Sequence, residues 1–489
     1  MGLDDGAKAT VLRSSSWDNL ARIRYHVEET LLHNEAGAPK LIGRTLPEQL
    51  TRGATMRTTI FNMVSTMLGS GMLSLPHTFA QLGLLGGLGM MLLIPFVGEI
   101  TIWFVAFAAE SANQMKHGVE PVSTLPAIVE LVLGRNTALL SAVSLIILNY
   151  GVAVSYCVVI KGLLPLTFQA LTGLATPPSQ AACLAFVSFT CLFPLSALKT
   201  TDQMRWASIV SVVLVYVFVF YIVAAGIMTL AEVPGALHKL LHPTSLVRGG
   251  VTEWLQAAPV VGFSYLCHQN VPTFYAEMRR QRSAGATSRW ASKATKFRCG
   301  SRAAMVVALA LYLATGLGGY AAFGTDTKPN VLLNFNPGPD AVLPDASVIG
   351  LRAAFVGTMV STFPTISHGL RTSLHALCLP HREATAAIRW SEAAVLVLLV
   401  GLVSNAVDNL GLVFQLVGST CGSVLMFILP ASLFLFGARE EQEGAAVAAA
   451  DAGVVGRVGD TVLAWLAVLF GLTVLIGSNV VTYVLTDPS

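Results

Sequence analysis

The feature that most constrains this sequence is a series of apolar stretches, each about 20 residues long, the length of a helix that crosses a bilayer. Hydrophobic residues make up 54% of the chain and charged residues only 12%. Soluble domains carry about 25% charged residues. A spanning segment must satisfy its backbone hydrogen bonds internally, so the sequence predicts an all-α polytopic membrane protein.

Eleven stretches qualify as membrane spans. We expect them at about 58–81, 84–110, 137–161, 179–198, 206–230, 255–276, 302–323, 347–371, 388–407, 410–436 and 458–483. Residues 1–55 are polar and are predicted to be a mostly disordered cytosolic tail, and residues 56–485 to form one transmembrane domain.

The Lys and Arg residues predict the orientation of these spans. With a cytosolic N-terminus, 25 of the 30 lie on the cytosolic side, as positively charged loops do in membrane proteins. The densest run, 279–302, is flanked by two spans. We therefore interpret it as a cytosolic loop and not as a nucleic-acid-binding segment.

Two of the spans contain residues that interrupt helices. Gly69, Ser70 and Gly71 lie in the middle of the first span, and polar residues that include His268 lie in the middle of the sixth, just before Pro272. Non-helical backbone is tolerated at this depth where it lines a cavity or is buried in protein. Tight helix packing and simple kinks are the alternative explanation.

The interrupted spans are five apart, as two inverted repeats of five spans would place them, with the eleventh span appended. In transporters built this way, half-helix ends at the midplane hold the substrate. We expect the backbone amides of residues 69–71 to hold a carboxylate and the carbonyls of Phe263 and Ser264 to hold an ammonium group. The predicted substrate-binding residues are Thr66, Gly69, Ser70, Gly71, Tyr156, Phe263, Ser264 and His268.

The first span, with FNMVSTMLGSGMLSLP, resembles the first helix of the amino acid/auxin permease family, which includes sodium-coupled neutral amino acid transporters. Further segments that resemble this family are FPLSALK, FSYLCHQNVPTFYAEM, GYAAFGTDTKPNVLLNF, TMVSTFPTISHGLRTSL and LVGSTCGSVLMFILPASLF. The resemblance covers residues from about 55 to 485. It implies a LeuT-like inverted-repeat fold and amino acid transport driven by sodium or protons.

The resemblance also implies a Na⁺ site between the first and eighth spans. Its ligands would be Ser65, the Leu68 carbonyl, Thr358, Ser361 and Thr362. Ser65 stands where sodium-coupled relatives commonly have asparagine, which weakens the sodium assignment and keeps protons as an alternative. These hydroxyls could equally bond to the preceding helical turn.

Proton coupling requires a titratable group, and two are candidates. His268 lies in the interruption of the sixth span, and an imidazole titrates in the useful range. Glu99 lies midway along the second span, where a carboxylate is costly unless it is neutral or partnered. For each residue a structural role is the alternative.

The motifs of the chain favour transport over catalysis. No nucleotide-binding or hydrolase motif stands in a soluble segment, so we expect neither an enzyme nor a bound cofactor, and a coupling ion, Na⁺ or H⁺, in their place. The absence of a clearly placed intramembrane acid favours neutral amino acids as substrates. An amino-acid sensor of the same fold and a transporter of another small organic solute remain alternatives, and so do the plasma membrane and the vacuolar or lysosomal membrane. The oligomeric state is left open.

Overall fold

The computed structural model describes residues 54–115, 122–198, 205–278, 289–335, 344–379, 382, 384–445 and 454–485. The predicted tail, 1–55, lies almost entirely outside these residues. The chain divides into two compact units. In the smaller, which comprises 1–53 and 375–383, the described part includes a contact of 2.8 Å between the His375 ring and the Arg382 carbonyl.

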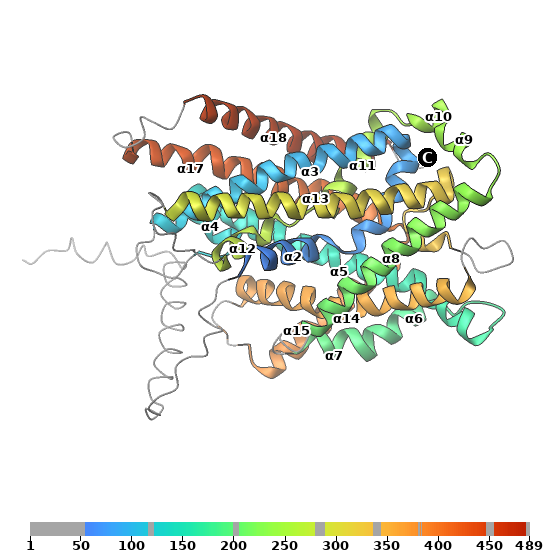
Figure 1. Cartoon of the computed structure of the whole chain (residues 1–489). Coiled ribbons are helices and arrows are strands. Elements are labelled where there is room, and N and C mark those ends of the chain that lie inside the picture. Colours follow the sequence, from blue (N-terminus) through green and yellow to red (C-terminus); the bar gives the residue numbers. More distant parts are fainter. Residues whose placement is uncertain are drawn as a thin grey trace, which may run out of the picture. The chain divides into compact units, whose positions relative to one another are not determined.

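The described residues of the larger unit form helices joined by turns and loops, together with an isolated β-bridge between Ala54 and Met278 (Figure 1). Helix α2 (Met56–Met67) ends at Leu68 and is followed by the 3₁₀ helix η1 (Ser70–Ser74) and then by α3 (Leu75–Met115). The first span is thus interrupted at the residues that the sequence predicted.

Helix α3 joins the second half of the first span to the whole second span through a bend at Gly83. The φ angle there is +76°, a conformation that favours glycine. A Cβ at this position would lie 2.8 Å from the Ser245 carbonyl oxygen. The positive φ angle and the nearby carbonyl oxygen therefore both require glycine at this bend.

The sixth span is also divided. Helix α11 (Val251–Ser264) is followed by η4 (His268–Asn270) and α12 (Val271–Glu277). The Ala54 amide donates a hydrogen bond to the Glu277 carbonyl at 2.8 Å, so the start of the first span is tied to the end of the sixth. We call this side of the membrane domain the N-terminal face and the opposite side, which carries α9 and α10, the distal face (Figure 1).

The remaining helices complete the bundle. Between the two interrupted spans lie α4 (Leu125–Leu133), α5 (Arg135–Thr172), α6 (Gln180–Val187), the π-helical η2 (Ser188–Leu192), α7 (Phe193–Ser196), α8 (Arg205–Glu232), α9 (Ala236–Leu241) and α10 (Pro243–Leu246). After α12 come α13 (Arg289–Phe323), η5 (Gly324–Asp326), η6 (Val331–Leu333), α14 (Asp345–Cys378), α15 (Ala386–Ala406), α16 (Leu410–Val417), η7 (Gly418–Gly422), η8 (Val424–Ile428), α17 (Leu429–Ala445), α18 (Val454–Val480) and η9 (Val481–Leu485).

The predicted all-α membrane fold is confirmed, but the predicted bounds of several spans are wrong. Helix α5 continues to Thr172 beyond the predicted end at residue 161, and α13 begins at Arg289 and not at residue 302. The predicted limits lie at charged residues, which are expected to lie outside the membrane. In the structure Lys161 is buried against Asp408, and Lys293 is buried over the Tyr275 ring. Helix α4 is too short to span a membrane and was not predicted.

Within the described residues, eight helices are long and apolar enough to cross a membrane. The predicted eleven differ because Ser70–Asn113 contains parts of two predicted spans, Gln180–Ser196 is short, and the sixth span is divided. The count of eleven stays a prediction.

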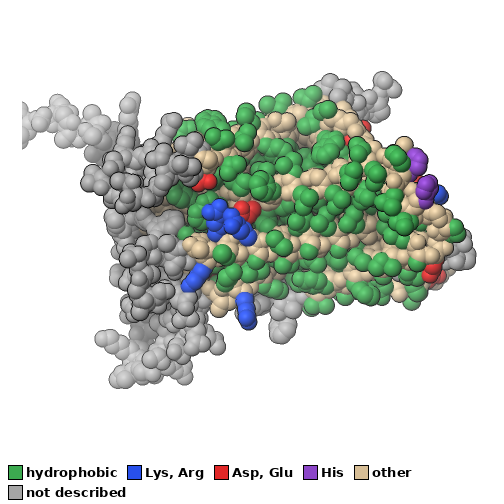
Figure 2. All heavy atoms as spheres, turned by 45° about the horizontal axis from the view of Figure 1, so that its top comes forward, with side chains coloured by type: hydrophobic (Ala, Val, Ile, Leu, Met, Phe, Trp, Pro, Cys, Tyr) green, Lys and Arg blue, Asp and Glu red, His purple; other side chains and the backbone are tan. Residues whose placement is uncertain are grey.

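The outer surface of the unit is apolar. Figure 2 shows hydrophobic side chains over most of the visible face, with Lys and Arg toward one end and His at the other. Large side chains such as Phe189 and Phe220 are 77% and 70% exposed. Such exposure suits contact with lipid and would be costly in water.

Candidate functional site

The two interrupted helices meet at Gly71 and Ser264. A Cβ on Gly71 would lie 2.6 Å from the Ser264 hydroxyl oxygen and 3.2 Å from the Ser264 Cα. Both residues are buried. The missing side chain of Gly71 therefore lets η1 approach the end of α11 closely.

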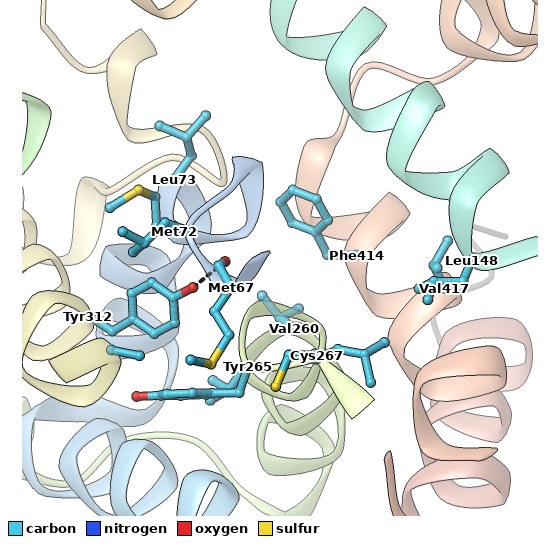
Figure 3. Close-up of a cluster of buried hydrophobic side chains, with 14 of the residues drawn as sticks. Met67, Met72, Leu73, Leu148, Val260, Tyr265, Cys267, Tyr312, Phe414 and Val417 are labelled. Carbon is cyan, nitrogen blue, oxygen red and sulfur yellow. Dashed lines mark hydrogen bonds between the residues drawn. The ribbon is translucent and has the colours of Figure 1, made fainter. Parts of the chain in front are cut away.

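Tyr312, on α13, binds the ends of both half-helices. Its hydroxyl lies 2.5 Å from the Met67 carbonyl oxygen (Figure 3) and 2.8 Å from that of Ser264. One hydroxyl proton serves one of these carbonyls at a time. The Tyr265 ring packs edge-on against Tyr312, with 4.9 Å between centroids. Carbonyls at helix C-termini carry partial negative charge, so this is where a cationic group would be stabilised.

Sequence reasoning missed Tyr312. It lies in an apolar run with no polar neighbour or motif to mark it. Its importance comes from two carbonyls that are 245 and 48 residues away along the chain.

The other side of the interruption of the first span faces α5. Ser155 donates to the Val152 carbonyl at 2.7 Å, so the 3.0 Å contact between the Ser70 and Ser155 hydroxyls is donated by Ser70. A Cβ on Gly69 would lie 4.0 Å from the Tyr156 hydroxyl. That hydroxyl also interacts with the Thr362 side chain on α14. The first, third and eighth spans thus meet around the Tyr156 hydroxyl.

The residues of the predicted ion site have different surroundings. The Ser65 hydroxyl is buried and, among the described residues, has no hydrogen-bond partner, which is the condition of an oxygen free to bind a cation. The hydroxyls of Thr358, Ser361 and Thr362 donate to carbonyls of the preceding turn at 3.0, 3.0 and 2.8 Å. Their lone pairs remain available, and the site, including the Leu68 carbonyl at the break, stays a prediction.

Two other predicted substrate-binding residues make contacts of their own. The Thr66 hydroxyl donates to the Asn62 carbonyl at 2.8 Å within its own helix. Phe263 stacks on Phe414 of α16, with 4.8 Å between ring centroids. The Phe263 ring thus joins the sixth span to the tenth.

His268 is held by the second span. Its Nε2 lies 2.9 Å from the Thr101 hydroxyl and 3.1 Å from the Gly98 carbonyl. Its Nδ1 is buried and has no partner within the described part of the chain. These contacts tie the interruption of the sixth span to the second span, and the role of His268 in substrate binding or proton coupling stays a prediction.

Glu99 is paired. Its Oε1 accepts a hydrogen bond from Arg302 Nε at 2.9 Å, and the Arg302 side chain is 55% exposed. The carboxylate that the sequence places midway along the second span is therefore half of an ion pair, and its role in proton coupling stays a prediction. A partnered carboxylate has less reason to carry a coupling proton.

A polar cavity of about 270 Å³ lies on the distal side of the interruptions. Its wall contains no Asp, Glu, Lys or Arg, and is formed by Ser74, His77, Thr78, Gln81, Gln256, Val260, Pro329, Asn409, Gly411, Leu412, Gln415 and Thr482. Ser74 donates to the Pro329 carbonyl at 2.5 Å, and the His77 ring meets the Thr327 carbonyl at 2.6 Å. The first span is thereby tied to the loop that follows α13.

Two interrupted helices that meet inside an all-helical bundle are the arrangement of the LeuT fold. The fold is similar to that of MhsT in complex with L-phenylalanine, with a TM-score of 0.55 and 14% identity over 86% of this chain and 98% of that one. It is also similar to the inward-facing conformation of Mhp1, with a TM-score of 0.53 and 14% identity over 89% of this chain and 91% of that one.

The sequence profile of the transmembrane amino acid transporter proteins matches residues 52–450. The chain belongs to this family, and it is an amino acid transporter, not an enzyme.

Several curated relatives are transporters. Vacuolar amino acid transporter 5 of Schizosaccharomyces pombe is 27% identical over 77% of this chain and 83% of its own length. Amino acid transporter AVT6B of Arabidopsis thaliana is 24% identical over 78% of this chain and 82% of its own length. The human sodium-coupled neutral amino acid transporter 7 is 24% identical over 80% of this chain and 82% of its own length. The resemblance drawn from the sequence is confirmed.

Proposed function

We propose that this chain is a secondary active transporter of neutral amino acids, coupled to Na⁺ or H⁺, that works by alternating access. The observation that carries the proposal is the contact of the Tyr312 hydroxyl with the carbonyls of Met67 and Ser264, beside the close approach of Gly71. Helix C-termini attract cations and helix N-termini attract anions. Both kinds of end occur where the interrupted spans meet.

The substrate would lie across this junction. Its α-ammonium group would be stabilised by the carbonyl ends of α2 and α11, and its α-carboxylate by the amides of residues 69–71, at the start of η1. A neutral side chain is favoured because no charged side chain lines the polar cavity on the distal side. The name of the human relative points to the same substrate class.

Coupling would use the first and eighth spans. The strongest support for an ion there is the buried Ser65 hydroxyl, which has no hydrogen-bond partner in the described part of the chain. Hydroxyl and carbonyl oxygens suit a hard cation. The first, second, sixth and seventh spans would move against the third, fourth, eighth and ninth. The N-terminal face would be cytosolic, and the name of the Schizosaccharomyces pombe relative favours a vacuolar or lysosomal membrane.

The test is uptake of radiolabelled amino acids into proteoliposomes under an imposed Na⁺ gradient and, separately, an imposed H⁺ gradient. Accumulation of neutral amino acids under either gradient supports the proposal, and the gradient that drives it identifies the ion. Absence of accumulation under both gradients contradicts it and favours a sensor or a different solute.

A further inference from the structure

A groove outside the transport site lies between the fourth and ninth spans. Its volume is about 550 Å³, and it is lined by Ala181, Leu184, Ala185, Ser188, Phe189, Phe193, Ala394, Val397, Leu398, Gly401, Leu402 and Asn405. Ten of these twelve residues are apolar. Phe189 and Leu398, one on each wall, are 77% and 62% exposed. The groove therefore opens on the surface that faces lipid.

The groove has the length of one leaflet. The two walls are antiparallel, because Phe193 near the end of the fourth span packs against Trp390 near the start of the ninth, with 5.3 Å between ring centroids. At about 1.5 Å of rise per residue, the wall from Ala181 to Phe193 is roughly 18 Å long. Half of a hydrocarbon core of about 30 Å is about 15 Å. The wall is thus slightly longer than one leaflet, and an acyl chain that enters from the distal face can extend along it to the Phe193–Trp390 pair.

One wall departs from α-helical geometry. The π-helical turn η2 (Ser188–Leu192) forms part of it, and such turns are frequent at functional sites. The buried Ser188 hydroxyl has no hydrogen-bond partner among the described residues. This turn gives the groove a shape that two regular α-helices would not.

A second cavity of about 330 Å³ lies at the distal end of the groove, and its polar lining residues are Lys161, Gln180, Asn330 and Asp408. Gln180, on its wall, precedes Ala181 of the groove, and Asp408 follows Asn405 of the groove by three residues. The two spaces therefore adjoin where the fourth and ninth spans reach the distal face. This is the level at which a phospholipid places its headgroup.

The charges of this cavity balance. The buried Lys161 ammonium donates to Asp408 Oδ1 at 2.7 Å, to the Val407 carbonyl at 2.9 Å and to the Asn405 carbonyl at 3.4 Å. Its three protons are thus all used. The Asp408 side chain is 87% exposed, so part of its carboxylate faces outward. A site without net charge, which presents a carboxylate, suits a zwitterionic headgroup better than an anionic one.

We propose that the groove and the cavity together bind one zwitterionic phospholipid of the distal leaflet. One acyl chain lies between the fourth and ninth spans and ends at Phe193 and Trp390. The headgroup lies in the cavity, with its cationic group toward Asp408. The site depends only on the membrane embedding of the chain and not on the transport mechanism.

Gly401 provides a direct test, because a Cβ built on it meets nothing within 4 Å. Gly401→Phe is designed to extend a ring into the groove from one wall, and Ala185→Phe from the opposite wall. Gly357→Phe is the matched control, because Gly357 is also open but lies on α14, outside the groove. Native mass spectrometry of the detergent-purified full chain, titrated with phosphatidylcholine, measures the bound lipid.

We expect a one-lipid adduct with the unmodified chain and with Gly357→Phe, and its loss in Gly401→Phe and Ala185→Phe. An undiminished adduct in both groove variants would overturn the site. In competition, phosphatidylglycerol that displaces phosphatidylcholine would overturn the zwitterionic preference, and a sterol that displaces it would overturn the acyl-chain assignment.

Discussion

Gly71 and Ser264 lie so close that no side chain fits between them: a Cβ on Gly71 would be 2.6 Å from the Ser264 hydroxyl oxygen. The first and sixth spans, almost 200 residues apart in sequence, are in contact at the point where each is interrupted. This contact fixes how the half-helices face each other.

Gly71→Ala is expected to abolish most uptake. Because the Ser264 Cα would also be only 3.2 Å away, backbone must move, and overpacking of this kind costs about 1–3 kcal/mol. Initial rates of uptake into proteoliposomes measure the effect. Gly357→Ala, at an open position, is the control, and full activity in Gly71→Ala would show that the close approach is not needed for transport.

Tyr312→Phe keeps the ring and removes the hydroxyl that serves the carbonyls of Met67 and Ser264. A buried carbonyl that loses its donor costs about 1–3 kcal/mol, and here the ends of both half-helices are affected. We expect a raised KM and a lowered maximal rate, measured as uptake against substrate concentration. Tyr216→Phe, on the exposed face of α8, is expected to behave like the unmodified chain, and unchanged kinetics in both variants would refute the role of Tyr312.

Ser65→Ala separates a functional hydroxyl from a structural one. The Ser65 hydroxyl has no hydrogen-bond partner among the described residues, so its removal costs no bond. Burial of an unpaired hydroxyl is itself unfavourable by about 1–3 kcal/mol. We expect an unchanged or raised thermal unfolding midpoint together with a loss of Na⁺-driven uptake. A lowered midpoint would instead indicate a structural role.

Substitution of Lys161 should lower the stability of the fold more than substitution of its partner Asp408. Asp408→Asn removes an exposed partner, and exposed ion pairs contribute only about 0–1 kcal/mol. Lys161→Met leaves the Asn405 and Val407 carbonyls without their charged donor, and hydrogen bonds to charged groups are worth about 1.5–3 kcal/mol each. Thermal unfolding in detergent should therefore show a larger loss of stability for Lys161→Met, and equal losses would argue against this account.

The stability of the fold should depend on pH through the Glu253 carboxyl group. The Thr252 hydroxyl and then backbone amides, including that of Gly250, hold the pKa of this carboxyl below its ordinary value of 4.5. A lowered pKa in the folded state stabilises the fold above that ordinary value, and the contribution is lost as the pH falls through the folded-state pKa. The stability difference between the unmodified chain and Glu253→Gln should therefore be present at neutral pH and should shrink in acid. A difference independent of pH would contradict this assignment.

The interruptions could be predicted from the sequence because glycine and proline act locally. Gly69, Gly71 and Pro272 weaken a helix wherever they stand, so two broken spans could be located without knowledge of their neighbours. The apolar runs predicted the helical membrane fold in the same way, since length and polarity alone decide whether a segment can span lipid.

The partners of polar side chains could not be predicted, because they depend on packing between distant segments. Glu99 and Arg302 are 203 residues apart. The position of His268 in the interruption was predictable, but its contact with the Gly98 carbonyl was not. The end of α5 was misplaced at residue 161 for the same reason, because the acceptors that neutralise Lys161 come from the ninth span and the loop after it.

The bond between the Ala54 amide and the Glu277 carbonyl has a mechanical consequence. Force applied to the chain just before Ala54 acts on α2 and, through this bond, on α12. Tension on the segment before Ala54 would therefore reach both half-helices on the N-terminal face. A protein that binds this segment would act on both interrupted spans at once.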